Sequence, residues 1–233
     1  WSYMTTFITT CSAVAVPYSE DFNGYTENVS SNNSAHSSYP YHSLPSCWSF
    51  INMSDNSGAQ PQAYLSSSLY YSADTTNFMI LSSEYGKTIY AALPKFNDPI
   101  SSLYLSMKYR TYSANETYNG KPEIGVMTDL GDTSTFILLE TLPTTATFTT
   151  AEHYFSIDSL QGNNYNIVIR YRATPDGYSS YSAMFDDIVV DIAPDCIRPL
   201  NLAVDSVGQT SVSLSWRNAN ATSNFVVEYK KAA

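Results

Sequence analysis

Charged side chains are scarce in this sequence, and acidic ones predominate. They make up 14 % of the 233 residues, with 11 Lys and Arg against 21 Asp and Glu, so the formal net charge is −10 at pH 7. An average soluble domain is about one quarter charged. Lys and Arg nowhere form a cluster that could neutralise a row of phosphates. The composition therefore argues against nucleic acid or an anionic membrane surface as a partner.

Long apolar runs are missing as well. No stretch approaches the roughly 20 apolar residues that a membrane span needs, so we expect no membrane insertion. Residues 1–7 also lack the basic and apolar regions of a signal peptide. These absences predict a soluble segment that is either mature or internal to a longer protein.

Cysteine is rare, with Cys11, Cys47 and Cys196 as the 3 examples. They form no CxxC pair, which argues against a zinc ribbon or a thioredoxin-like redox motif. Cys11 could pair with Cys196 if the strands at the two ends of the intervening domain lie together, or with Cys47. Either bridge would need an oxidising exterior.

Aromatic and hydroxyl side chains take the place of the missing charges. The chain has 20 Tyr, 10 Phe and 3 Trp, with only 9 Gly and 11 Pro. β-Branched and aromatic residues suit a pleated surface, so this composition favours strands and turns over helices. It excludes collagenous and disordered classes.

Alternation with a period of two predicts strands along most of the chain. In residues 103–110, Leu103, Leu105, Met107 and Tyr109 fall on one face. Residues 165–172 repeat this pattern, and no window of helical periodicity competes with it. Similar short runs occur at 48–52, 78–82, 88–93, 123–128, 136–142 and 184–192. About ten short strands separated by turn residues predict an all-β fold, a two-sheet sandwich.

Two other segments organise the chain. Residues 25–46 are polar and without periodicity, which predicts a long surface loop. Pro194 and Pro199 follow the run at 184–192 and interrupt any continuing ladder, so a new unit should begin there. Its predicted strands are 200–204, 211–216 and 224–229.

This new unit resembles the first half of a fibronectin type III domain. The resemblance rests on Pro199-Leu-Asn-Leu, on Thr210-Ser-Val-Ser-Leu-Ser-Trp216 and on Phe225-Val-Val-Glu-Tyr229. About forty residues are present where such a module needs roughly a hundred. Residues 1–11 are similar to the last strand of another such module. The resemblance implies a piece of a longer repeat array, with 193–233 as the N-terminal part of one unit.

Residues 12–192 resemble the cleaved-adhesin or MAM-like jelly rolls, also called choice-of-anchor J domains, of bacterial surface proteins. The motifs are Val16-Pro-Tyr-Ser-Glu-Asp-Phe22, Pro45-Ser-Cys-Trp48, Tyr90-Ala-Ala-Leu-Pro94, Gly125-Val-Met-Thr-Asp129 and Met184-Phe-Asp-Asp-Ile-Val-Val190. The resemblance implies a jelly-roll β-sandwich that is extracellular or on the cell surface. It also implies a non-catalytic module that adheres or binds carbohydrate and is often stabilised by calcium.

Four carboxylates are the candidate metal ligands. Glu20 and Asp21 open the domain, and Asp186 and Asp187 lie in its predicted closing strand. The first and last strands of jelly rolls are commonly neighbours, so these groups could meet. Their mutual repulsion would be relieved by Ca²⁺, which takes six to eight oxygen ligands. Because adjacent strand residues point to opposite faces, we expect Glu20 and Asp186 as the main ligands. The alternative is that all four are solvated edge charges or turn caps.

Catalytic constellations are not recognisable. His36, His42 and His153 belong to no HExxH motif or Cys/His cluster, which predicts surface histidines. The strand motif Glu-x-Asp-x-x-Glu of retaining sandwich glycosidases does not occur either. We therefore expect no enzyme, and a hydrolase is the least favoured alternative.

Tyrosines are the candidate ligand surface, since each carries a flat apolar face for a sugar ring and a hydroxyl for hydrogen bonding. Those at predicted loops or strand ends are Tyr39, Tyr41, Tyr112, Tyr118, Tyr178 and Tyr181. Exposure alone does not make them functional. Trp48 and Trp216 are expected to fill cores. The predicted partner is a glycan or a host surface protein, and the alternative is a spacer that binds nothing.

Overall fold

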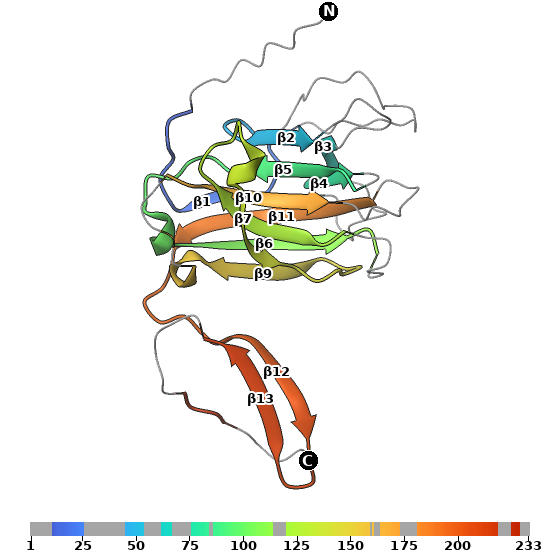
Figure 1. The fold of residues 1–233 in the computed structure, drawn as a ribbon, viewed down its shortest axis with the longest axis vertical. Coiled ribbons are helices and arrows are strands. Elements are labelled where there is room, and N and C mark those ends of the chain that lie inside the picture. Colours follow the sequence, from blue (N-terminus) through green and yellow to red (C-terminus); the bar gives the residue numbers. More distant parts are fainter. Residues whose placement is uncertain are drawn as a thin grey trace, which may run out of the picture.

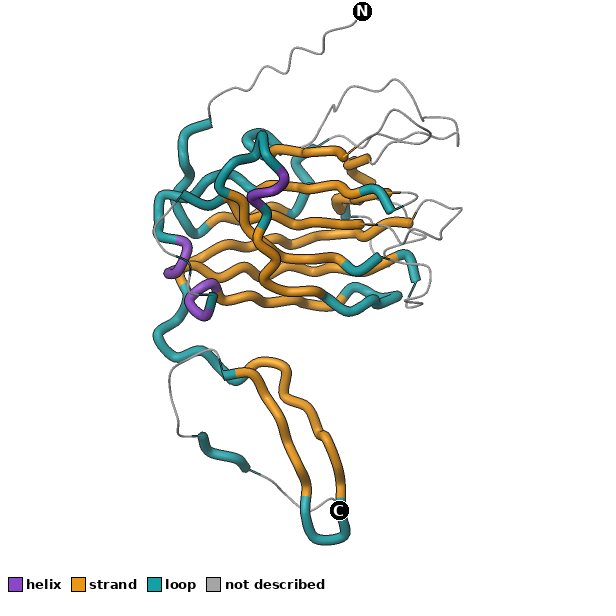
Figure 2. The backbone as a smooth tube through the Cα atoms, viewed as in Figure 1, coloured by secondary structure: helices purple, strands orange, loops and turns teal. Residues whose placement is uncertain are grey.

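The computed structural model describes residues 11–25, 45–53, 62–66, 76–83, 86–113, 120–158, 160, 164–172, 181–218 and 225–228. Strands dominate these residues (Figure 1). Their helical elements are short 3₁₀ turns, namely η1 (Ile100–Ser102), η2 (Thr133–Thr135) and η3 (Phe155–Ile157) (Figure 2). In the described part of the chain, no helix has the length and apolar character to cross a membrane.

Two antiparallel sheets form a sandwich. The first has the order β3-β4-β11-β6-β9, and the short strand β1 also pairs with β11. Its strands are β1 (Tyr18–Glu20), β3 (Gln62–Ser66), β4 (Phe78–Ser83), β6 (Leu103–Thr111), β9 (Thr149–Tyr154) and β11 (Tyr181–Ile192). The second sheet has the order β2-β5-β10-β7-β8. Its strands are β2 (Ser49–Met53), β5 (Thr88–Ala92), β7 (Pro122–Met127), β8 (Ile137–Thr141) and β10 (Asn166–Arg172). The predicted all-β sandwich is confirmed.

The core lies between the sheets and follows the predicted alternation. In β6, Leu103, Leu105, Met107 and Tyr109 are buried, while the residues between them are partly or fully exposed. Each fully buried side chain of this size contributes about 1.5–3 kcal/mol relative to exposure. Trp48 also lies in this core, as predicted.

The first and last strands of the sandwich are neighbours. Residues 18–20 of β1 pair with 188–190 of β11, next to the place where β4 pairs with 181–185. Between Asp186 and Val189 the pairing of β11 with β6 shifts register, and Asp187 has a φ of 47°. This β-bulge breaks the simple alternation that the sequence predicted for Asp186 and Asp187.

The outer face of the second sheet is covered by the chain itself. Tyr90 and Val168 are buried there, beneath Leu130 and Phe136 of the β7–β8 connection. The guanidinium of Arg170 lies 4.0 Å from the centroid of the Phe136 ring and pairs with Glu123. These contacts cover Tyr90 and Val168 on this face.

The C-terminal unit is a hairpin of β12 (Leu200–Val207) and β13 (Val212–Arg217), which extends away from the sandwich in Figure 1. The root of this hairpin, residues 197–200, is packed against the sandwich, since Ile197 and Leu200 form a buried cluster with Tyr154 of β9. Further along, apolar side chains are exposed, namely Leu202, Val204, Val207 and Val212.

Two expectations for this unit were wrong. Residues 225–228 are not in a strand. Trp216 is half-buried against the Phe225 ring and does not fill a core, because in the described residues the hairpin has no second sheet over it.

Candidate functional site

Three of the four predicted metal ligands share one hollow. Glu20 and Asp21, at the end of β1, line it together with Asp187 from the bulge of β11. Its other walls are Ser19, Ile188 and Val189. Asp186 does not line this hollow, because the bulge places it among the buried residues.

Glu20 is held by the turn that follows it. Its Oε1 accepts a hydrogen bond from the Phe22 N–H at 2.9 Å, and its Oε2 accepts one from the Tyr25 hydroxyl at 3.1 Å. Partial burial raises the pKa of Glu20 above its usual value, although both hydrogen bonds oppose this shift. Asn77 fixes the same turn, because its Nδ2 donates to the carbonyl oxygens of Phe22 and Tyr25.

Asp186 and Asp187 of β11 have hydrogen-bond and ion-pair partners of their own. Asp186 Oδ1 accepts the Asp187 N–H at 2.8 Å. The carboxylate of Asp187 lies 2.6 Å from Lys108 Nζ, and both of these side chains are about half exposed. Such an exposed pair contributes little to stability.

The carboxylates that share this hollow are of the donor type that Ca²⁺ prefers, since it binds carboxylate and carbonyl oxygens. No group of three or more His, Cys, Asp or Glu is gathered tightly enough to hold a metal within the described ranges. Tyr25 already donates to Glu20 and Lys108 already pairs with Asp187, so these two groups compete with an ion for the carboxylates.

Two of the predicted tyrosines lie together. Tyr112, just after β6, is 42 % exposed. Its ring centroid is 6.4 Å from that of Tyr181, the first residue of β11, and the rings meet edge to face. The Tyr112 N–H also donates to the Ser182 carbonyl at 3.0 Å, so the two strand ends are joined.

A buried threonine fixes this tyrosine pair. Thr111 is fully buried, and its hydroxyl lies 2.7 Å from the Ser113 carbonyl oxygen and 3.0 Å from that of Thr145, so its single proton can serve either acceptor. The Thr145 N–H donates back to the same hydroxyl. The backbone that carries Tyr112 is therefore anchored to the β8–β9 connection. The other candidates, Tyr39, Tyr41, Tyr118 and Tyr178, lie outside the described residues.

His153 is buried, which corrects the expectation of surface histidines. It lies on the inward face of β9 and has no exposed surface. Its Nδ1 is 2.7 Å from Glu140 of β8, and its Nε2 is 2.7 Å from Asp158 after η3. The sequence missed this site because neither carboxylate lies at a spacing that marks a pair. His36 and His42 lie outside the described residues.

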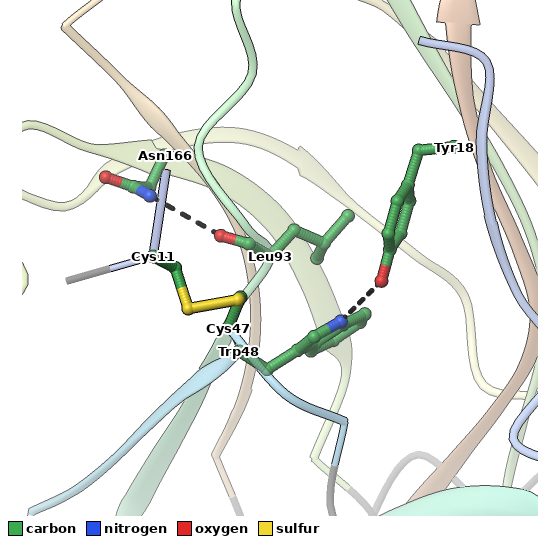
Figure 3. The surroundings of a disulfide bond; sticks show 6 residues. All are labelled: Cys11, Tyr18, Cys47, Trp48, Leu93 and Asn166. Atoms are coloured by element: carbon green, nitrogen blue, oxygen red, sulfur yellow. Dashed lines mark hydrogen bonds between the residues drawn. A yellow bond between two sulfur atoms is a disulfide. The ribbon is translucent and has the colours of Figure 1, made fainter. Parts of the chain in front are cut away.

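The disulfide joins Cys11 to Cys47, one of the alternatives that the sequence left open, with the Cα atoms 5.5 Å apart (Figure 3). Beside it, Trp48 Nε1 donates to the Tyr18 hydroxyl at 2.7 Å, and Asn166 Nδ2 donates to the Leu93 carbonyl. Cys196 is free and exposed. A disulfide is consistent with an extracellular location.

Comparison with known proteins identifies the fold. No protein-family model matches the sequence, and no curated protein matches it. The K1 cleaved adhesin domain of Lys-gingipain from Porphyromonas gingivalis W83 aligns with a TM-score of 0.51 at 11 % identity, over 76 % of this chain and 98 % of that domain. The K2 domain of Lys-gingipain gives 0.49 at 12 % identity, over 75 % and 99 %. The CBM22-1 xylan-binding domain of Paenibacillus barcinonensis Xyn10C gives 0.45 at 6 %, over 75 % and 92 %. The match to the K1 domain shows that the described part of this chain shares the β-sandwich fold of that domain.

Proposed function

We propose that this chain is a non-catalytic binding module of an extracellular or cell-surface multidomain protein, and that it binds a glycan or a host surface protein. The observation that carries the proposal is the pair formed by Tyr112 and Tyr181. The disulfide and the adhesin-like fold support the location.

The tyrosine pair has the properties that a saccharide site needs. The exposed Tyr112 ring offers an apolar face on which a sugar ring could stack, and tyrosine hydroxyls supply hydrogen bonds. The hydrogen bonds of Thr111 and Ser182 hold its backbone before a ligand arrives. Such preorganisation reduces the entropic cost of binding.

A glycan array, followed by titration with the best glycan, tests this proposal. Tyr112→Ala should lose at least tenfold in affinity, whereas Tyr112→Phe should keep most of it if stacking dominates. Leu138→Ala is the matched control, because Leu138 is 47 % exposed on β8, outside the tyrosine pair. Unchanged binding by Tyr112→Ala would reject the pair as the site.

A structural spacer is the second candidate. The packed root of the hairpin favours it, because Tyr154, Ile197 and Leu200 join the two parts of the chain through buried apolar contacts. A spacer would bind nothing specifically in the array.

In either case we propose residues 12–192 as the jelly roll and 193–233 as the first part of a fibronectin type III unit. Residues 1–11 remain proposed as the trailing strand of a preceding fibronectin-like module, and residues 1–10 of this segment lie outside the described residues.

We also propose that calcium stabilises the jelly roll. Glu20, Asp21 and Asp187 would supply carboxylates from the hollow between β1 and β11, with Asp186 held behind them. The ion would neutralise carboxylates that otherwise repel each other at the edge of the sheet. Its role would be structural.

A further inference from the structure

One carboxylate oxygen of Glu140 contacts two basic side chains, His153 and Arg217. Its Oε2 is 2.7 Å from His153 Nδ1 and 3.5 Å from Nη2 of Arg217, the last residue of β13. His153 belongs to the sandwich, whereas Arg217 belongs to the C-terminal hairpin. The same carboxylate therefore lies between the two parts of the chain.

The geometry around His153 favours a protonated ring. Both ring nitrogens lie 2.7 Å from a carboxylate oxygen. A neutral imidazole has one N–H, so one of the two carboxylates would then face a lone pair. Burial lowers the pKa of His153, but the hydrogen bonds to Asp158 and Glu140 outweigh it, and the net shift is upward.

No other charged group contacts the ring in the described part of the chain. The Phe155 ring of η3 packs edge to face against it. From β6, the Tyr109 hydroxyl donates to the Pro143 carbonyl, and burial and the Glu140 charge raise its pKa. Glu152, the residue before His153, pairs instead with Arg198.

Arg217 has an unused donor beside Glu140. Its Nε is buried and has no hydrogen-bond partner among the described residues. The contact of its Nη2 with Glu140, at 3.5 Å, is at the long limit for a hydrogen bond. A buried donor without a partner costs free energy, and a carboxylate can accept two parallel N–H groups from arginine. Arg217 therefore has a second donor that is available for a hydrogen bond to a carboxylate.

We propose that His153 and Arg217 compete for Glu140, so that loss of the His153 proton transfers the carboxylate to Arg217 and tightens the hairpin against the sandwich. The proton leaves to solvent from Nδ1, and the Nε2–H of the neutral ring stays hydrogen-bonded to Asp158. The described residues provide no other cation for Asp158. Glu140 then turns from the Nδ1 lone pair to Nε–H and Nη2–H of Arg217. The hairpin is thus held more firmly as the pH rises.

The competition predicts opposite shifts in the His153 midpoint, measured by ¹⁵N NMR of the ring. Asp158→Asn should lower the midpoint because it removes a counter-charge. Arg217→Gln should raise it by about half a pH unit or more, because it removes a rival cation. Arg198→Gln is the matched control, since Arg198 pairs with Glu152 on the same root and should leave the midpoint unchanged.

The movement of Glu140 toward Arg217 can be measured separately, at the arginine. With ¹⁵N-labelled arginine, the Nε–H signal of Arg217 should shift downfield and exchange more slowly with water as His153 deprotonates, at the same midpoint. Glu140→Gln should abolish this response. The proposal is overturned if Arg217→Gln behaves like Arg198→Gln, or if the Arg217 signal is constant across the titration. Arg217 is one-third exposed, so its replacement should not prevent folding.

Discussion

Gly125 of β7 lies directly beneath Phe136, whose ring occupies the place that a Cβ atom at position 125 would take. The carbonyl oxygen of Ile137 in the paired strand β8 overlaps the same place. The absence of a side chain thus lets the β7–β8 connection fold back over the outer face of the second sheet, where Phe136 meets Arg170.

Gly125→Ala should therefore destabilise the sandwich. The added methyl group must displace backbone as well as a ring, and such overpacking costs about 1–3 kcal/mol. Urea denaturation would measure the loss. Gly24→Ala is the control, because nothing lies within 4 Å of a Cβ at position 24. Equal stability of both variants would show that β8 can move aside freely.

Removal of the disulfide should lower the stability of the fold more than Gly125→Ala does. Cys11 and Cys47 are 36 residues apart, and closing a loop of this length stabilises a fold by about 4 kcal/mol in the chain-entropy model. The double variant Cys11→Ser/Cys47→Ser should melt well below the wild type. Cys196→Ser should melt like the wild type, since this thiol is free and exposed. The disulfide account fails if a reducing agent leaves the melting temperature of the wild type unchanged.

Calcium should raise the melting temperature if the hollow between β1 and β11 binds it. A ligand at a hundred times its dissociation constant stabilises the native state by about 2.7 kcal/mol. Asp187→Asn should lose most of this gain, whereas Asp195→Asn, an exposed residue of the connector, should keep it. Identical melting with calcium and with chelator would remove Glu20, Asp21, Asp186 and Asp187 as ligands.

The stability of the sandwich should fall as the pH rises through the folded-state pKa of His153. This pKa is raised above the unfolded value, which is about 6.5, so the stabilisation is fully present below that value. Denaturation at a series of pH values from 5.5 to about 9 would show the decline. His153→Gln should flatten it, while replacement of His36 and His42 should not. A slope that persists without His153 would assign the effect to other groups.

The sequence predicted the parts of the fold that follow simple alternation. In β6, apolar residues at every second position met the core, because nothing interrupts the pleat there. β9 was missed, since its inward positions are Ala151 and His153 and so carry little apolar signal. A period of two cannot show that a buried histidine replaces an apolar residue when its partners come from β8 and η3.

The candidate sites, too, could be predicted from the sequence only in part. The neighbouring position of β1 and β11 followed from the expected jelly-roll order. The bulge at Asp187 did not, because a single inserted residue leaves no periodic trace in a strand of 12 residues. The meeting of Tyr112 and Tyr181 depends on how β6 pairs with β11, which single-strand patterns do not encode.

The covalent ring closed by Cys11 and Cys47 contains β1, the short strand whose start lies beside the end of β11. Without that ring, tension between the two ends of the domain would peel β1 from β11 one hydrogen bond at a time, as a zipper opens. With it, a pull that arrives at Cys11 passes directly to Cys47 and the adjacent β2 in the other sheet. The mechanical load is then shared by both layers of the sandwich.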